Sequence, residues 1–193
     1  MYMFREDYAI VLDYLQRGYA DSFRKEPIAQ ALGETYFSLL ELVPRPGSTL
    51  LLRERVYIGP DKREKVQFIR GRLDYNRLTV TGKNELQSVV EELVKRNEPK
   101  YIEFFNKAGP ISVRQHSLEL LPNIGKKHMW DIVNQREKKP FESFKDITTR
   151  INLMPDPVRV ITERILEELK GTSKYHLFIR PPRSEEYQSF RQG

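Results

Sequence analysis

The chain has 193 residues, 33 of them Lys or Arg and 27 Asp or Glu, with 39% hydrophobic residues and no cysteine. This length and apolar content suit one large or two small packed domains and exclude a wholly disordered chain. The lack of cysteine excludes disulfide scaffolds, thiolate zinc sites and cysteine nucleophiles.

Short β-strands separated by turns are predicted for the first part of the chain, residues 1–81. Residues 8–15 are β-branched and aromatic, and residues 35–43 are apolar before a Pro/Gly turn at 44–47, so both segments predict strands. Alternation is clearest at 48–59. Its apolar face would carry Leu50, Leu52, Val56 and Ile58, and its polar face Arg53, Arg55 and Tyr57. Such closely spaced strands suggest a small barrel.

The apolar period is ambiguous over 65–78 and becomes helical near Gly82. We expect a helical connector over 82–108, in which Glu98-Pro99 separates two helices. The spacing of Ser112 and Gln115 is that of a capping box, which predicts another helix start.

Helix caps continue to the end of a predicted helical domain, 109–171. Ser143 and the Asp156-Pro157 pair are placed as N-caps, and Gly171 lies where a C-terminal cap belongs. The last segment, 172–193, is predicted to hold a strand at 175–179 that pairs with the barrel, followed by a mobile tail from residue 184.

One connection in the helical domain predicts a binding site. Pro122 stops a helix after Leu121, Ile124 can be buried, and Asn123 and Gly125 can adopt positive φ. This resembles the helix-hairpin-helix motif, whose hairpin reads Leu-Pro-Gly-Ile-Gly, with Asn123 in place of the first glycine. Free amides at such a hairpin bind a phosphate, and adjacent lysines add charge. The predicted phosphate-binding residues are Asn123, Ile124, Gly125, Lys126 and Lys127.

A second, glycine-free copy is predicted at 153–157, and we expect it to complete the core rather than contact a ligand. Two segments are basic: 45–83 has ten basic and four acidic residues, and 122–150 has seven and four. Such blocks can bind nucleic-acid phosphates, although a solvated surface explains either one alone. The predicted supporting residues are Arg53, Arg55, Tyr57, Arg70, Arg72, Arg136, Lys138 and Lys139.

No enzyme signature is found in the sequence. The three histidines lack metal-ligand spacing, and neither a phosphate-binding loop ending in Lys-Ser/Thr nor a Gly-x-Ser-x-Gly elbow is present. We therefore predict a non-enzymatic protein with no catalytic residues, metal or cofactor. No apolar run reaches the roughly 18–20 residues that span a bilayer, and the start lacks a signal-peptide pattern. A cytoplasmic protein with no membrane partner is expected.

Several longer segments resemble an archaeal family known as domain of unknown function 655, over about Tyr8 to Pro181. They are 8–15, 26–31, 37–44, 54–59, 118–122 and 164–171. The resemblance implies an α+β protein with an OB-like barrel followed by a tandem helix-hairpin-helix domain. It also implies nucleic-acid binding, with RNA favoured over DNA, and genes that lie near those for translation and ribosome maturation, whose proteins are candidate partners. The resemblance defines no catalytic residues. Two functions stay open: nucleic-acid binding, or an adaptor in translation, ribosome maturation or DNA repair whose helical domain docks a partner protein.

Overall fold

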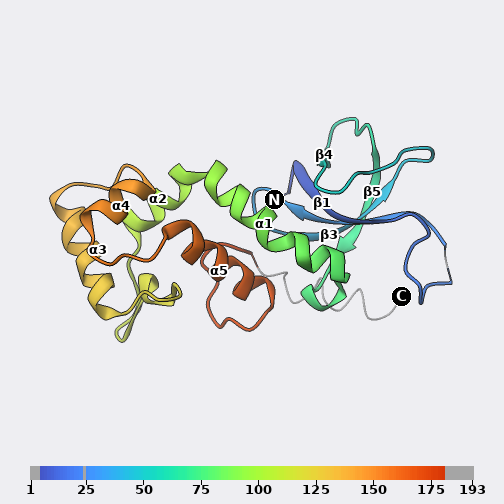
Figure 1. Cartoon of the computed structure of the whole chain (residues 1–193). Helices are drawn as coiled ribbons and strands as arrows, with labels where there is room; N and C mark the ends of the chain where they lie inside the picture. Colours follow the sequence, from blue (N-terminus) through green and yellow to red (C-terminus); the bar gives the residue numbers. More distant parts are fainter. Residues whose placement is uncertain (1–4, 24, 181–193) are drawn as a thin grey trace. The chain divides into compact units, whose positions relative to one another are not determined.

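The computed structural model describes residues 5–23 and 25–180 (Figure 1). The chain forms two compact units. Unit 1 runs up to Lys83 and resumes at Glu168, and unit 2 comprises Asn84–Glu167. The first crossing lies close to the predicted end of the barrel at residue 81. The predicted connector falls almost wholly in unit 2, whereas the segment after Glu167 belongs with the strands of unit 1.

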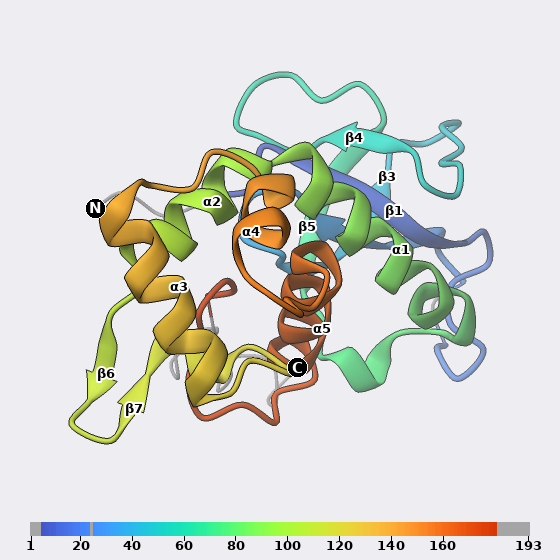
Figure 2. The same cartoon turned by 60° about the vertical axis from the view of Figure 1, so that its left-hand side comes forward.

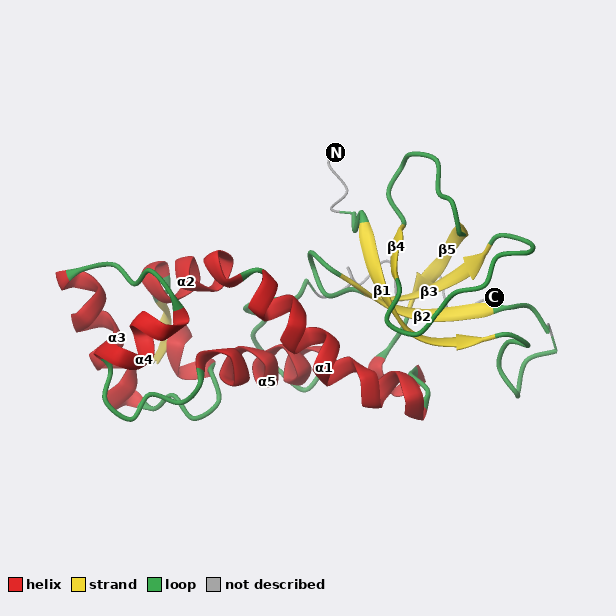
Figure 3. Ribbon diagram, turned by 45° about the horizontal axis from the view of Figure 1, so that its top comes forward, coloured by secondary structure: helices red, strands yellow, loops and turns green. Residues whose placement is uncertain are grey.

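Unit 1 is built on a curled, five-stranded antiparallel sheet that forms a half-barrel (Figure 3). The strand order is β4-β1-β2-β3-β5, so β4 pairs with β1 at one edge and β5 with β3 at the other. The strands are β1 (Tyr8–Leu15), β2 (Ile28–Gly33), β3 (Leu39–Pro44), β4 (Arg55–Tyr57) and β5 (Val66–Arg72). A short 3-10 helix, η1 (Tyr75–Arg77), follows the sheet.

Alternating residues of the strands fill one face of the sheet with a core of small and branched side chains. Ala9, Ala29 and Ala31 are fully buried there, and larger residues such as Leu42 and Val66 fill the remaining space. Register shifts interrupt β1 and β3. Such bulges increase the local twist of a strand, which suits a sheet that curls.

The strand predictions are confirmed at β1, but three others were incomplete or wrong. β2 was not predicted as a strand, although all of its residues are buried. The strand expected at 35–43 begins only at Leu39, because the buried Glu6 carboxylate accepts the amides of Thr35, Tyr36 and Ser38 and holds a turn there. The strand expected over 48–59 is reduced to β4.

A turn divides the segment before β4. Arg53 has a φ of 63°, and its amide donates to the carbonyl of Val11. Leu52, predicted to be in the core, is 48% exposed. The alternating pattern therefore predicted a longer strand than the one that forms. The hydrogen bond from Arg53 to Val11, 42 residues earlier in the chain, belongs to a turn and not to a continuous strand ladder.

Unit 2 is helical, with one small β-hairpin (Figure 2). Helix α1 starts in unit 1, and helix α5 ends there. The elements are α1 (Val80–Arg96), α2 (Glu98–Lys107), β6 (Pro110–Ser112), β7 (Gln115–His116), η2 (Ser117–Leu120), α3 (Lys126–Lys138), α4 (Phe144–Arg150) and α5 (Pro157–Leu169). Within residues 5–23 and 25–180, no helix is long and apolar enough to cross a membrane.

The predicted caps hold in three places and fail in one. The Ser143 hydroxyl accepts the amide of Asp146, the Asp156 carboxylate accepts that of Val158, and Gly171 has a φ of 73°. No helix begins at Ser112, which lies in the β6–β7 hairpin. Instead the capping box is one turn later, where the His116 ring and the Glu119 carboxylate cap η2.

The predicted C-terminal strand is wrong, because residues 175–179 form bends rather than a ladder. The amides of Leu177, Phe178 and Ile179 donate to the carboxylate of Glu168 at 2.7, 3.0 and 3.0 Å. Glu168 is 1% exposed, so its charge is compensated by these donors. The segment does belong to unit 1, and Arg72 donates to the carbonyl of Arg180. The expected mobile tail lies outside the described residues.

Candidate nucleic-acid interface

Two connections in unit 2 have the same backbone turn. Asn123 has a φ of 62° and Leu153 a φ of 55°, so each is in the left-handed region. In the first turn the amide of Ile124 donates to the carbonyl of Leu121 at 3.1 Å. In the second the amide of Met154 donates to the carbonyl of Ile151 at 3.4 Å. The second turn thus falls at the start of the segment 153–157, where the glycine-free copy of the hairpin is predicted.

The first turn has most of the predicted hairpin geometry. Asn123 has the expected positive φ, and Ile124 is 4% exposed between the two helical segments. Gly125 differs: its φ is −88°, so the prediction of a positive φ there is wrong. It is the N-cap of α3, and a Cβ built at this position would meet nothing within 4 Å.

The start of α3 offers unpaired hydrogen-bond donors and positive charge. Its glycine N-cap supplies no side-chain acceptor, and no acidic residue lies in its first turn. Such a helix start carries free amides and a partial positive charge. Lys126 and Lys127 are exposed, and neither has an ion pair or side-chain hydrogen bond with any described residue. Amides and ammonium groups therefore lie together at this end of the helix.

The start of α5 has the opposite character. Asp156 precedes it, and its carboxylate accepts the amide of Val158 at 3.1 Å. Pro157, the first helical residue, has no N–H to offer. A negative side chain thus occupies the place where an external anion would bind, and only the first of the two turns can accept a phosphate readily.

Most of the predicted cationic residues of the sheet already contact groups of unit 1. The Arg55 guanidinium forms two hydrogen bonds with Glu34, at 2.8 and 3.0 Å, and lies 3.4 Å from the centre of the Tyr8 ring. Tyr57 packs edge-on against Tyr8 and bonds to Asp61. Arg53 lies in the turn before β4 rather than in the strand, so these residues do not form the continuous face that was predicted.

The remaining predicted residues divide between paired and exposed groups. Arg70 forms ion pairs with Glu26 and Glu41, and Arg136 donates to the carbonyl of Phe105. Burial lowers the pKa of the Arg136 guanidinium. Lys139 pairs with Glu142 on the surface. Lys138 is exposed in the last turn of α3, the helix that begins with Lys126 and Lys127.

Two residues of this region were missed from the sequence. Arg150 donates to the carbonyls of Gln135, Lys139 and Pro140, and so caps the end of α3. Trp130 is on the outer face of α3 and is 58% exposed. The sequence alone could have indicated this exposure, because Trp130 is the single tryptophan of the chain and lies outside the apolar stripe of its helix.

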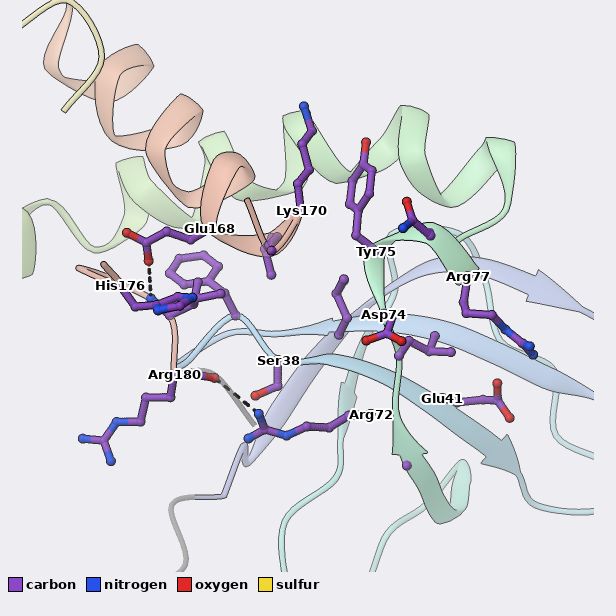
Figure 4. A pocket seen from close by; sticks show the side chains of 18 of the residues that line it. Ser38, Glu41, Arg72, Asp74, Tyr75, Arg77, Glu168, Lys170, His176 and Arg180 are labelled. Carbon is purple, nitrogen blue, oxygen red and sulfur yellow. Dashed lines mark hydrogen bonds between the residues drawn. The ribbon is translucent and has the colours of Figure 1, made fainter. Parts of the chain in front are cut away.

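Unit 1 also contains a concave pocket of about 910 Å³, shown in Figure 4. Arg72, Lys170 and Arg180 are among its lining residues, together with the acidic Glu41 and Glu168. The carboxylate of Glu168 is taken up by backbone amides, and that of Glu41 by Tyr19 and Arg70. Lys170 lies over the ring of Tyr75. Because these charged side chains already contact other groups of unit 1, the pocket does not indicate a particular class of ligand. Among the described residues, no three His, Asp or Glu side chains gather as metal ligands.

Comparison with known proteins gives two archaeal relatives. The chain is 50% identical over 177 residues to the uncharacterized protein MJ0038 of Methanocaldococcus jannaschii, covering 91% of this chain and 80% of that protein. It is also similar to the crystal structure of Af1531 from Archaeoglobus fulgidus, with a TM-score of 0.83 and 46% identity over 91% of this chain and all of that one. The model of the family described as a protein of unknown function, DUF655, matches residues 5–180. The chain belongs to the DUF655 family.

Proposed function

We propose that this protein binds nucleic acid without catalysing a reaction, and that the first turn of unit 2, with Lys126 and Lys127, holds a backbone phosphate. The contrast between the two turns carries this proposal. They share a backbone geometry, yet Gly125 leaves the amides of α3 available, whereas the Asp156 carboxylate already accepts an amide at the start of α5. A glycine cap followed by two lysines that pair with no described residue has the chemistry of an anion site.

The strand order of unit 1 supports an OB-like reading of the half-barrel. Proteins of that class are five-stranded, partly open barrels that bind oligonucleotides across strands 2 and 3. Here every residue of β2 and β3 is buried. The Gln30 side chain contacts the carbonyl of Arg77 and the amide of Thr79, so the chain's own residues cover part of that surface. The turn before α3 is therefore the stronger candidate for the main contact.

An adaptor role is the second candidate, favoured by the β6–β7 hairpin. Val113 at its tip is fully exposed, and Ile111 is 38% exposed. Exposed apolar side chains on a small hairpin are suited to contact with another protein. Binding of nucleic acid and docking of a protein predict different results in the experiment below.

Fluorescence anisotropy with a labelled single-stranded RNA 12-mer, and with DNA of the same sequence, tests the proposal at two salt concentrations. We expect binding that weakens with salt, because phosphate contacts release counterions. The double variant Lys126→Glu/Lys127→Glu should lose at least tenfold in affinity. Its circular dichroism should stay unchanged and its melting temperature should not fall, since both residues are exposed and acidic side chains suit the start of a helix.

A charge-matched control separates the local contact from net charge. Lys95→Glu/Lys107→Glu makes the same change in charge on α1 and α2, at residues that form surface ion pairs. We expect a clearly smaller loss of affinity in this control. Equal losses in the two double variants would contradict a phosphate site at the turn. Absence of binding by the parent chain at low salt would contradict the proposed function and favour the adaptor.

A further inference from the structure

Trp130 presents a large aromatic surface on the outside of α3. It is 58% exposed, whereas Met129 beside it is 6% exposed and Ile132 is fully buried. None of the aromatic or cation–π contacts among the described residues involves Trp130. Within residues 5–23 and 25–180, its indole ring therefore packs neither on another ring nor under a cation. An exposed tryptophan contributes little to the fold, because most of its apolar surface stays in contact with water.

The same face of α3 carries the lysines at its start. Trp130 is four residues after Lys126 and three after Lys127, the two spacings that place side chains next to each other on a helix. Helical side chains lean toward the N-terminus, so the indole is expected to lean toward the turn from which the lysines project. Asn134, four residues after Trp130, is also exposed and continues this face by one turn.

We propose that Trp130 stacks on an unpaired base of a single-stranded nucleic acid whose backbone is held by Lys126 and Lys127. The inference rests on the proposed function and adds the class of nucleic acid. A planar ring beside ammonium groups fits a strand that offers a base and a phosphate next to each other. Stacking on an aromatic side chain is the usual means by which proteins bind single strands.

A duplex does not offer the same contact. Its bases are paired and stacked on one another, so an indole ring on a helix surface can reach their faces only if one base leaves the stack. The phosphates of a duplex remain accessible to Lys126 and Lys127. The structure therefore predicts that both forms bind, that single strands bind more tightly, and that only single strands contact Trp130.

Intrinsic fluorescence of the full chain tests this directly, because Trp130 is the single tryptophan in the sequence. We expect a single-stranded RNA 12-mer to quench the emission as it binds. A 12-mer with abasic residues at its central positions should bind more weakly and quench little. The matching duplex should raise the anisotropy of a label while leaving the tryptophan emission almost unchanged.

Substitutions identify the contribution of the ring. Trp130→Ala should weaken single-strand binding about tenfold, within the range for loss of one stacked base, and leave duplex binding unchanged. Trp130→Phe should recover much of that loss, because a smaller aromatic face remains. Phe68→Ala removes another exposed aromatic side chain, 44% exposed on β5, and serves as the control that should bind like the parent.

The outcomes separate this inference from the proposed function. If Lys126→Glu/Lys127→Glu abolishes binding but Trp130→Ala binds single strands like the parent, the phosphate site stands and the stacking proposal is overturned. Equal quenching by the abasic strand or by the duplex also overturns it. If the parent binds no nucleic acid, both proposals fail.

Discussion

Asn123 and Leu153 hold the same left-handed backbone conformation, at φ values of 62° and 55°, in the two turns of unit 2. Asparagine adopts this region more readily than other non-glycine residues, whereas leucine has no polar side chain to compensate the steric cost. Leu153 is also 81% exposed, so its side chain returns little packing energy. The second turn is thus held in place by its surroundings rather than by its own sequence.

Leu153→Asn should therefore stabilise the protein by up to about 1 kcal/mol, since Asn relieves part of the cost of positive φ. Chemical denaturation of the parent and the variant measures the difference. Leu153→Ala, which shortens the side chain but keeps the strain, is the control and should give a smaller change. A Leu153→Asn variant that is no more stable than Leu153→Ala would contradict relief of the positive φ as the source of the gain.

Gly125→Asp should give the first turn the self-capped character of the second. The new carboxylate would accept amides at the start of α3, as Asp156 does at α5, and would repel a phosphate. The backbone at Gly125 is ordinary and has space for a Cβ, so we expect equal or slightly higher stability, by a few tenths of a kcal/mol at about the level of an N-cap exchange.

Nucleic-acid affinity in Gly125→Asp should fall at least tenfold in the anisotropy assay. Gly125→Asn is the neutral control, because it can cap the helix without adding charge and should lose less. Undiminished binding by Gly125→Asp would remove the amides of α3 from the phosphate contact. Because the φ of Gly125 is −88° and not positive, Gly125→Val should not strain the backbone either.

The buried carboxylate of Glu168 should control the order of residues 177–179. Three amides donate to it, so Glu168→Ala leaves three donors without a protein acceptor and should cost about 3 kcal/mol, while Glu168→Gln keeps one acceptor and should cost about 2 kcal/mol. Thermal melting measures the loss, and hydrogen exchange at Leu177–Ile179 should accelerate. Removing residues 172–193 deletes the donors and should also lower the melting temperature. Unchanged hydrogen exchange in Glu168→Ala would show that the Glu168 carboxylate does not hold residues 177–179 in place.

The His116 ring should make unit 2 sensitive to mild acid. Its Nδ1 accepts the amide of Leu118 at 3.1 Å, and burial, followed by the nearby Arg136, lowers the pKa of His116. A lowered pKa in the folded state means that stability is fully present above the unfolded pKa of about 6.5 and is lost as pH falls through the folded value. We expect an NMR titration midpoint below 6.5 for this ring.

Denaturation between pH 7.5 and 5 provides the matching stability test. His116→Asn can still accept the amide of Leu118 but does not titrate, so its stability should fall less with pH than that of the parent. Identical pH profiles for the two proteins would show that protonation of His116 does not weaken the cap.

Local features of unit 2 were determined by the sequence itself. Pro122 ends the preceding segment, Asn123 adopts the left-handed turn, and Ser143 caps α4, each as predicted. Such features depend on bonds and steric contacts within about four residues, so the types of neighbouring residues decide them. The backbone of the turn proposed to bind phosphate therefore follows from its own residues.

Only the tertiary structure decided which charged groups remain available. Arg55 pairs with Glu34 and Arg70 with Glu26, across 21 and 44 residues, and Glu168 captures the segment that was predicted to be a strand. By composition alone, Arg55 and Arg70 are as good candidates for binding phosphate as Lys126 and Lys127. Because folding brings distant carboxylates to some cations and not to others, the positive charge of a segment does not reveal which of its side chains a ligand can meet.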